Sequence, residues 1–159
     1  MTSPDRRHRG AHLGTLLGVF AALVAAGTAA CSDTTGPGVR HELATSRWDE
    51  AGLEDYSFVY EQLCFCPFTG PHRVTVEGGA VVDVTPLPGS NSVGELDPEY
   101  FPTIDDLLER LRDAAERNPV QFDVTYDDEL GYPNRADVDI SEQIVDEEYS
   151  FEVSELAAT

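Results

Sequence analysis

The feature that most constrains the fold is the alternation of side chains from Asp55 to Pro67. If this stretch is a β-strand, Tyr56, Phe58 and Tyr60 share one face, because successive side chains of a strand point to opposite sides. An aromatic face of this kind is typical of a strand that covers a hydrophobic core. Cys64 and Cys66 continue the same face. The stretch therefore predicts a strand with aromatic side chains in the core and two cysteines at its end.

The other patterns predict two helices and five more strands. A helix is expected over 42–53, ended by Gly52, and a second begins at Thr103 as its N-cap and stops at Asn118-Pro119. Gly78-Gly79 predicts a two-residue hairpin, because both turn positions tolerate positive φ. The segment 68–71 is expected to be a loop. The strands are expected where apolar and polar residues alternate: 73–77, 80–84, 120–126, 135–140 and 149–153.

The order helix, three strands, helix, three strands predicts an α+β fold. We expect an antiparallel β-sheet with helices packed on one face, built as two α-β-β-β halves. The alternation fits a sheet that is covered on one side only. A domain of this size can build a core without a metal or a disulfide.

The first 31 residues have the three parts of a secretory signal. Arg6-Arg7-His8-Arg9 is a positive region, Leu13–Ala26 is apolar, and small residues precede Cys31. The ending resembles a bacterial lipobox, in which the cysteine is lipidated, although Thr28 stands where Leu is usual. Two alternatives are cleavage after Ala30 and an uncleaved anchor. Residues 32–40 are rich in Gly and Thr and predict a flexible tether. Residues 41–159 then form a single domain, placed outside the cytoplasm on a membrane.

The charge of the chain excludes one class of partner. The whole sequence has a formal net charge of −20, with ten arginines, no lysine and 30 acids. A surface so acidic repels nucleic acid at long range, so no nucleic-acid partner is expected. The simplest interpretation of the acids is a solvated surface.

A set of short motifs follows in order along the chain and resembles a known family. The motifs are Trp48, Tyr56-Ser57-Phe58, Cys64-Phe65-Cys66, Gly78-Gly79, Thr103, Val124-Thr125-Tyr126-Asp127, Gly131-Tyr132-Pro133, Asp139 and Asp146-Glu147-Glu148-Tyr149. Together they resemble the domain-of-unknown-function family 6174, small exported or lipid-anchored bacterial proteins. The resemblance covers about residues 46–153. It implies a location and a fold and assigns no catalytic residue.

Cys64 and Cys66 leave three interpretations open. In an oxidising compartment two cysteines favour a disulfide. In a regular strand their Cα atoms lie at the edge of disulfide reach, so the bond needs a bulge or a bend before Pro67. A strained bridge would be easy to reduce, which suits a redox dithiol. The third interpretation is a pair of metal thiolates with His72 as a third ligand, although zinc sites usually need four ligands.

Two further sets of residues are candidates for binding. Tyr132 lies in a Gly-x-Pro turn, where an aromatic residue usually packs as a lid but can also contact a partner. Asp146 and Glu147 belong to an acidic set that could supply oxygen ligands to calcium if two loops converge. No EF-hand spacing is present, and a solvated rim is the simpler interpretation. The other members of the set are Asp127, Asp128, Glu129, Asp137, Asp139 and Glu148.

Catalysis has little support in the sequence. The chain has no Gly-x-Ser-x-Gly, no phosphate-binding glycine loop and no pair of metal-ligand histidines. No catalytic residue, metal ligand or cofactor is therefore assigned. The leading hypothesis is a non-enzymatic envelope domain that is held to the membrane by a lipid and binds an envelope protein or ligand. The alternative is a thiol-redox or metal-handling protein that uses Cys64 and Cys66.

Overall fold

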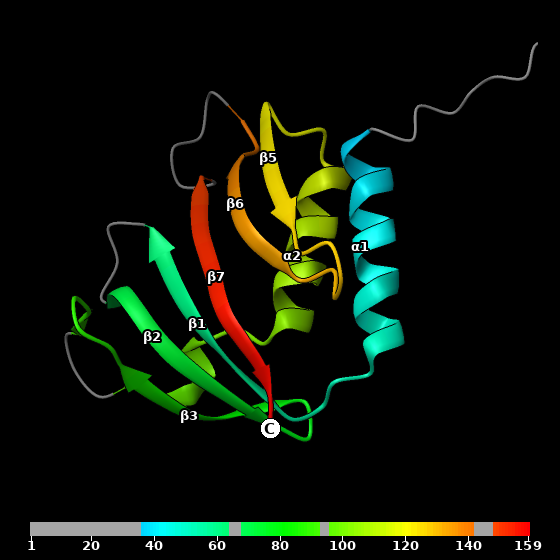
Figure 1. Cartoon of the computed structure of the whole chain (residues 1–159). Coiled ribbons are helices and arrows are strands. Elements are labelled where there is room, and N and C mark those ends of the chain that lie inside the picture. The colour runs from blue at the N-terminus through cyan, green and yellow to red at the C-terminus, as the bar shows by residue number, and fades with distance from the viewer. Residues whose placement is uncertain (1–35, 64–67, 93–95, 142–147) are drawn as a thin grey trace, which may run out of the picture. The chain divides into compact units, whose positions relative to one another are not determined.

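The computed structural model describes residues 36–63, 68–92, 96–141 and 148–159. These residues form two α-helices, one 3-10 turn and seven strands (Figure 1). In chain order they are α1 (Pro37–Ala51), β1 (Tyr56–Leu63), β2 (Phe68–Glu77), β3 (Ala80–Pro86), β4 (Asn91–Ser92), η1 (Pro98–Tyr100), α2 (Ile104–Glu116), β5 (Gln121–Tyr126), β6 (Pro133–Asp139) and β7 (Tyr149–Ala158).

The sheet is antiparallel and joins the two halves of the chain side by side. Its strand order is β3-β2-β1-β7-β6-β5, and the short β4 pairs with the start of β2. The three strands after α1 therefore form one side of the sheet and the three strands after α2 form the other. They meet where β1 pairs with β7 (Figure 1). This arrangement confirms the predicted α+β class and the two α-β-β-β halves.

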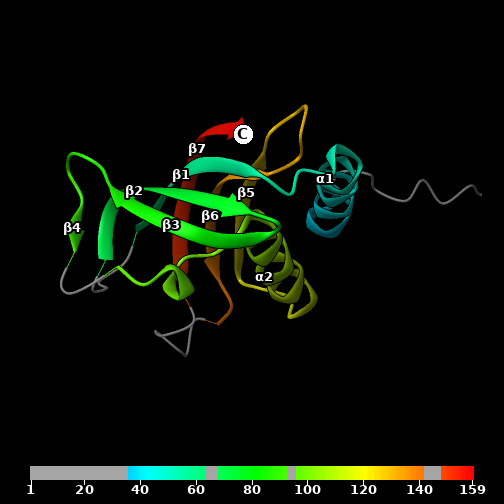
Figure 2. The same ribbon diagram turned by 90° about the horizontal axis from the view of Figure 1, so that it is seen from below.

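One face of the sheet carries the core, and the aromatic residues of β1 lie at its centre. Tyr56 and Phe58 have no exposed surface, and Tyr60 is 3% exposed. Their neighbours on β2 and β7 are also buried, among them Val74 and Phe151. Helix α2 packs on this face (Figure 2), and α1 lies beside α2 and adds Trp48 to the same core. The strand predicted from the alternation is thus the middle of the core.

The start of α2 is fixed by the residues that the sequence marks. The Thr103 hydroxyl accepts a hydrogen bond from the Asp106 amide at 3.1 Å, and the Asp106 carboxylate accepts one from the Thr103 amide at 2.8 Å. This reciprocal capping box satisfies two amides that the first turn of a helix leaves without partners. The buried residues of α2 form one stripe along the helix: Ile104, Leu107, Leu108, Leu111 and Ala114.

The opposite face of the sheet is polar, as the alternation predicts for a sheet with one buried side. Two cross-strand ion pairs lie on it, Arg73 with Glu155 and Arg135 with Glu152. Ser150 donates a hydrogen bond to Asp137 at 3.0 Å on the same face. Because these pairs are exposed, each contributes little to stability.

Several predicted boundaries are wrong. The segment 68–71 is the start of β2 rather than a loop, because Phe68 and Thr69 pair with β4 and the Phe68 ring stacks on Tyr100. Strand β7 runs to Ala158, five residues beyond its predicted end, because its second half pairs with the start of β1. Helix α1 begins at Pro37, within the segment predicted to be a tether.

Helix α1 buries one face and exposes the other. Its buried residues are His41, Ala44 and Trp48, which are spaced three and four apart, and Leu43 is 51% exposed on the other side. The helix ends at Gly52, which takes the left-handed conformation with φ +57 and confirms the predicted stop.

Candidate functional site

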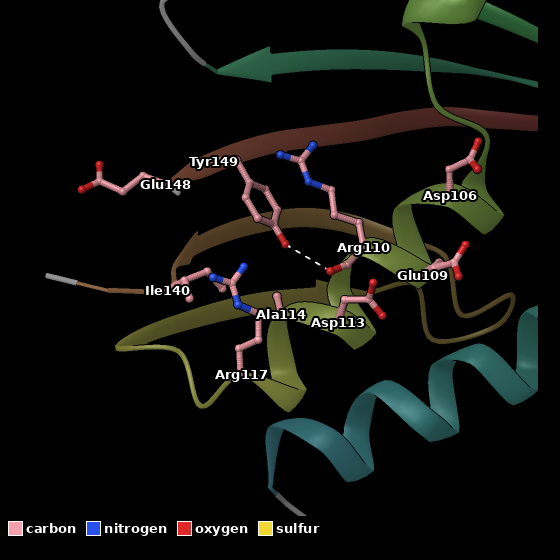
Figure 3. Close-up of a pocket in the computed structure, with 9 residues that line it drawn as sticks. All are labelled: Asp106, Glu109, Arg110, Asp113, Ala114, Arg117, Ile140, Glu148 and Tyr149. Carbon is pink, nitrogen blue, oxygen red and sulfur yellow. Dashed lines mark hydrogen bonds between the residues drawn. The ribbon is translucent and has the colours of Figure 1, made fainter. Parts of the chain in front are cut away.

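A hollow on the helical side of the domain lies between α2 and the start of β7. It has a volume of 520 Å³ and is open to solvent. Ala114 and Ile140 contribute apolar surface, and both are less than 10% exposed. The other lining residues are charged or aromatic (Figure 3): Asp106, Glu109, Arg110, Asp113, Arg117, Glu148 and Tyr149. We call this hollow the Arg110 pocket.

The pocket is organised by the contact between Arg110 and Tyr149. The guanidinium carbon of Arg110 lies 3.7 Å from the centre of the Tyr149 ring, a cation–π contact. The Tyr149 hydroxyl also donates a long hydrogen bond, 3.5 Å, to the backbone carbonyl of Arg110 (Figure 3). One tyrosine therefore holds both the backbone and the side chain of Arg110. Among the residues that the structure describes, Arg110 forms no ion pair.

Three of the four carboxylates in the lining have partners elsewhere. The Asp106 carboxylate belongs to the capping box of α2. Glu109 and Asp113 both accept hydrogen bonds from Arg112, at 3.0 Å and 3.2 Å. These acids nevertheless keep lone pairs that can accept further hydrogen bonds, since a carboxylate has about four acceptor sites. The pocket therefore offers both kinds of charge, with Arg110 as a cation that forms no ion pair among the described residues.

At neutral pH the Tyr149 phenol in the pocket is uncharged and the Arg110 side chain is positively charged. Burial raises the pKa of Tyr149, although the nearby Arg110 and Arg117 partly oppose the rise. The phenol therefore keeps its proton at neutral pH. An arginine side chain is always protonated in proteins. The two groups can donate hydrogen bonds to a ligand, and neither exchanges protons near pH 7.

A second hollow of 620 Å³ lies between α1 and α2. It is bordered by carboxylates, including Glu42, Asp49 and Glu116, and by the buried His41. The carboxylates lie on exposed helix faces, where solvated acids are common. A smaller groove of 290 Å³ runs between α1 and β5, with Arg40 and Arg47 on one side and Asp128 on the other.

His41 connects α1 to the sheet. Its Nδ1 lies 3.0 Å from the Tyr126 hydroxyl on β5, and its Nε2 lies 3.4 Å from the Thr45 hydroxyl. The side chain is 5% exposed. Burial and the positive charge of Arg112 lower the pKa of His41, while Glu42 opposes them. The ring is therefore held in its neutral form in the folded protein.

Acidification is expected to weaken the contribution of His41 to stability. An unfolded chain binds a proton at this histidine near its ordinary pKa of about 6.5, whereas the folded chain does so only at lower pH. Protons thus bind preferentially to the unfolded state as the pH falls below about 6.5, and the loss ends below the folded pKa. Urea unfolding of the full chain at pH 7.5 and pH 5.5 measures the effect, with His41→Gln as the reference.

The comparison between the two chains isolates this histidine, because the carboxylates that titrate in the same range are common to both. We expect the stability advantage of the wild type over His41→Gln to shrink at pH 5.5. An advantage that is equal at both pH values would contradict a lowered pKa at His41.

The comparison with protein-family models decides which family these motifs belong to. The model of the family of unknown function DUF6174 matches residues 40–158. The chain belongs to the DUF6174 family. The match covers most of α1, all of α2 and the seven strands of the described residues. It confirms the predicted resemblance and assigns no activity to this DUF6174 domain.

Other comparisons add no relative. No curated protein and no solved structure matches the chain. In the described part of the DUF6174 chain, no helix is long and apolar enough to cross a membrane.

Five of the predicted site residues lie outside the described part of this DUF6174 chain. Cys31, the predicted lipidation site, is one of them. Cys64 and Cys66, for which a disulfide, a redox dithiol and a metal site were all open, are two more. The binding candidates Asp146 and Glu147 are the others. These assignments remain predictions.

Tyr132 is described, and its loop does more than form a turn. Its side chain is half-buried against the core. Pro133 beside it has less than 2% of its surface exposed, and Gly131 touches α1 directly. Burial raises the pKa of Tyr132, with a smaller effect from Asp127. Packing accounts for this position, and a role of Tyr132 in binding stays a prediction.

Asp127, Asp137 and Asp139 of the acidic set accept hydrogen bonds from groups of their own chain. Asp127 accepts hydrogen bonds from the amides of Glu129 and Leu130, which closes the turn after β5. Asp139 accepts one from the Ser141 amide. No group of three or more His, Cys, Asp or Glu residues suited to a metal ion occurs among the residues described.

His72 was considered as a third metal ligand beside the cysteines. It is 2% exposed on the core face of β2, and its Nδ1 lies 2.9 Å from the Gly70 carbonyl oxygen. Its ring also packs on Phe101. These contacts place His72 within the core of the DUF6174 domain.

The sequence did not reveal the Arg110 pocket. Arg110 and Arg117 lie in the helix predicted to begin at Thr103, and Tyr149 lies in the predicted strand 149–153. Arg110 and Tyr149 are 39 positions apart in the sequence, and no spacing indicates that they are in contact. One signal was available, since Arg110, Asp113 and Arg117 lie on one helix face at intervals of three and four.

Proposed function

We propose that this chain is an exported, lipid-anchored protein of the bacterial cell envelope whose domain binds a ligand without catalysing a reaction. The order of the leader supports export and a lipid at Cys31. The acidic surface suits a soluble domain that stays outside the membrane. A short segment then connects the DUF6174 domain to its lipid anchor.

The observation that carries the binding function is the Arg110 pocket. The hollow has a volume of 520 Å³, and an aromatic ring holds its arginine in place. This volume and the mixed polar and apolar lining are those of a small-molecule or peptide site. Because Tyr149 and Arg110 keep their protons near neutral pH, they are suited to holding a ligand rather than to proton transfer. The pocket opens to solvent and is accessible to ligands of the envelope.

Cross-linking of the full chain in isolated envelopes tests the proposal. We expect the wild type to sediment with the membranes and to form a specific cross-linked product. Cys31→Ser is expected to lose membrane retention, since lipidation requires the thiol. Arg110→Ala is expected to keep membrane retention and to lose the cross-linked product, because it removes the cation that the pocket presents.

Arg47→Ala is the matched control, since it removes an exposed arginine of α1 that borders a different groove. It is expected to keep both properties. Membrane retention of Cys31→Ser would refute the lipid anchor. A product that forms equally with Arg110→Ala, or no product with the wild type, would refute binding through this pocket.

A further inference from the structure

We infer that the Arg110 pocket takes a small zwitterion, in which a carboxylate and an ammonium group share one apolar framework, as in a free amino acid or a short peptide. The inference rests on the proposed binding function and specifies the chemistry of the ligand. It is based on the donors of Arg110, the carboxylates around them and the apolar surface between them.

The Arg110 side chain is oriented to bind a carboxylate. The guanidinium carbon of Arg110 lies over the Tyr149 ring, 3.7 Å from its centre. A cation–π contact of this kind uses none of the guanidinium N–H groups as hydrogen-bond donors to a carboxylate, so they remain able to bind one. A carboxylate is planar and accepts two parallel hydrogen bonds from such an edge. Arg117 lies on the same lining, close enough to affect Tyr149, and adds a second positive charge.

The lining disfavours a ligand with only a negative charge. Among the described residues, it carries the carboxylates of Asp106, Glu109, Asp113 and Glu148 against the two arginines Arg110 and Arg117. The whole chain adds a formal net charge of −20, which repels anions at long range. A simple anion would gain the contact with Arg110 and lose part of that gain to its acidic surroundings.

A ligand with only a positive charge fits no better, because it would lie beside the Arg110 guanidinium without neutralising it. An ammonium group on a zwitterion avoids both costs. It can donate hydrogen bonds to the remaining lone pairs of Asp113 or Glu109 while the carboxylate faces Arg110. A zwitterion also carries no net charge, so the acidic chain does not repel it at long range.

The apolar part of the ligand has a defined place. Ala114 and Ile140 line the pocket together with the Tyr149 ring (Figure 3). Both aliphatic residues belong to the buried core and are held in place by it. An aliphatic side chain on the zwitterion would cover this surface and gain the free energy of apolar burial.

Isothermal titration calorimetry of the detergent-solubilised full chain tests the inference with four probes. L-leucine and L-leucyl-L-leucine carry both charges. 4-Methylpentanoate lacks the ammonium group of leucine, and 3-methylbutylamine lacks its carboxylate. We expect saturable binding of at least one zwitterion, with an affinity at least about tenfold above those of the two singly charged probes, which corresponds to about 1.4 kcal/mol.

Variants connect the binding to the pocket. Arg110→Ala is expected to lower the affinity for the zwitterion at least tenfold, and Arg110→Lys to lower it less, because lysine keeps the charge and loses the planar fork. Arg47→Ala should bind as the wild type does. Retained heat with Arg110→Ala would overturn the inference. So would binding of 4-methylpentanoate as tightly as leucine.

Failure of the inference can be told from failure of the proposed function. If none of the four probes binds but envelope cross-linking still depends on Arg110, the zwitterion is wrong and the binding function holds. If cross-linking is also independent of Arg110, both are wrong.

Discussion

Replacement of Gly131 by alanine is expected to lower the free energy of unfolding by about 2–5 kcal/mol. A Cβ atom at this position would lie 2.1 Å from the carbonyl oxygen of Ala44 and 3.0 Å from the Cβ of Arg47. Both belong to α1, and the first is backbone, so the helix itself must move. Gly131 also has φ +81, a conformation that strains any residue with a side chain. Urea unfolding of the full chain measures the loss.

Gly78→Ala is the matched control. Gly78 also has positive φ, +56, but nothing lies within 4 Å of a Cβ built there. Gly78→Ala is expected to lower the free energy of unfolding by about 1–2 kcal/mol, from conformational strain alone. The difference between the two variants therefore measures the contact between the β5–β6 turn and α1. Equal losses would contradict the argument that Gly131 is required for close packing.

This contact shows why the sequence predicted the turn at Gly131-Tyr132-Pro133 but not its purpose. Gly-x-Pro indicates a turn from local conformational preferences alone. The neighbour that excludes a side chain at Gly131 is Ala44, 87 residues earlier. No local pattern encodes this contact, because it depends on how α1 packs against the turn between β5 and β6.

In the rest of the fold, too, local features were predictable from the sequence and features that depend on tertiary packing were not. The N-cap at Thr103, the hairpin at Gly78-Gly79 and the aromatic face of β1 are encoded within a few residues, and they were predicted. The start of α1 was missed because Gly36 and Pro37 were assigned to a tether by composition. Proline at the first position of a helix is itself a start signal, and it was available.

The Arg110 pocket, in contrast, is not encoded by any short stretch of sequence. It depends on the pairing of β6 with β7, which brings Tyr149 beside Val138, and on α2 crossing the same end of the sheet. Both facts are tertiary. Residues that meet only through the packing of a helix on a sheet leave no periodic signal in a single sequence, so this part of the candidate site could not be predicted.

Tyr56 should be the most sensitive position of β1. The side chain has no exposed surface, and Trp48 packs edge-on against its ring with centroids 5.2 Å apart. Its hydroxyl accepts a hydrogen bond of 3.1 Å from the amide of Ile104, the first residue of α2. Burial raises the pKa of Tyr56 to about 12, so the hydroxyl stays neutral. The residue therefore joins β1, α1 and the start of α2.

Two substitutions separate these roles. Tyr56→Ala is expected to lower the free energy of unfolding by about 3–5 kcal/mol, the usual cost of emptying an aromatic site in a core. Tyr56→Phe keeps the ring and removes the acceptor of the Ile104 amide, which is expected to cost about 1–3 kcal/mol. Urea unfolding of the full chain measures both.

Tyr60→Phe is the control that decides whether the hydrogen bond matters. Tyr60 lies two residues along the same face and is 3% exposed, yet among the described residues its hydroxyl makes no hydrogen bond. Loss of that hydroxyl is expected to change stability by less than about 0.5 kcal/mol. A similar loss from Tyr56→Phe and Tyr60→Phe would show that burial of the phenol, rather than its bond to Ile104, sets the sensitivity of β1. A larger loss at Tyr56 alone would place that sensitivity at the start of α2.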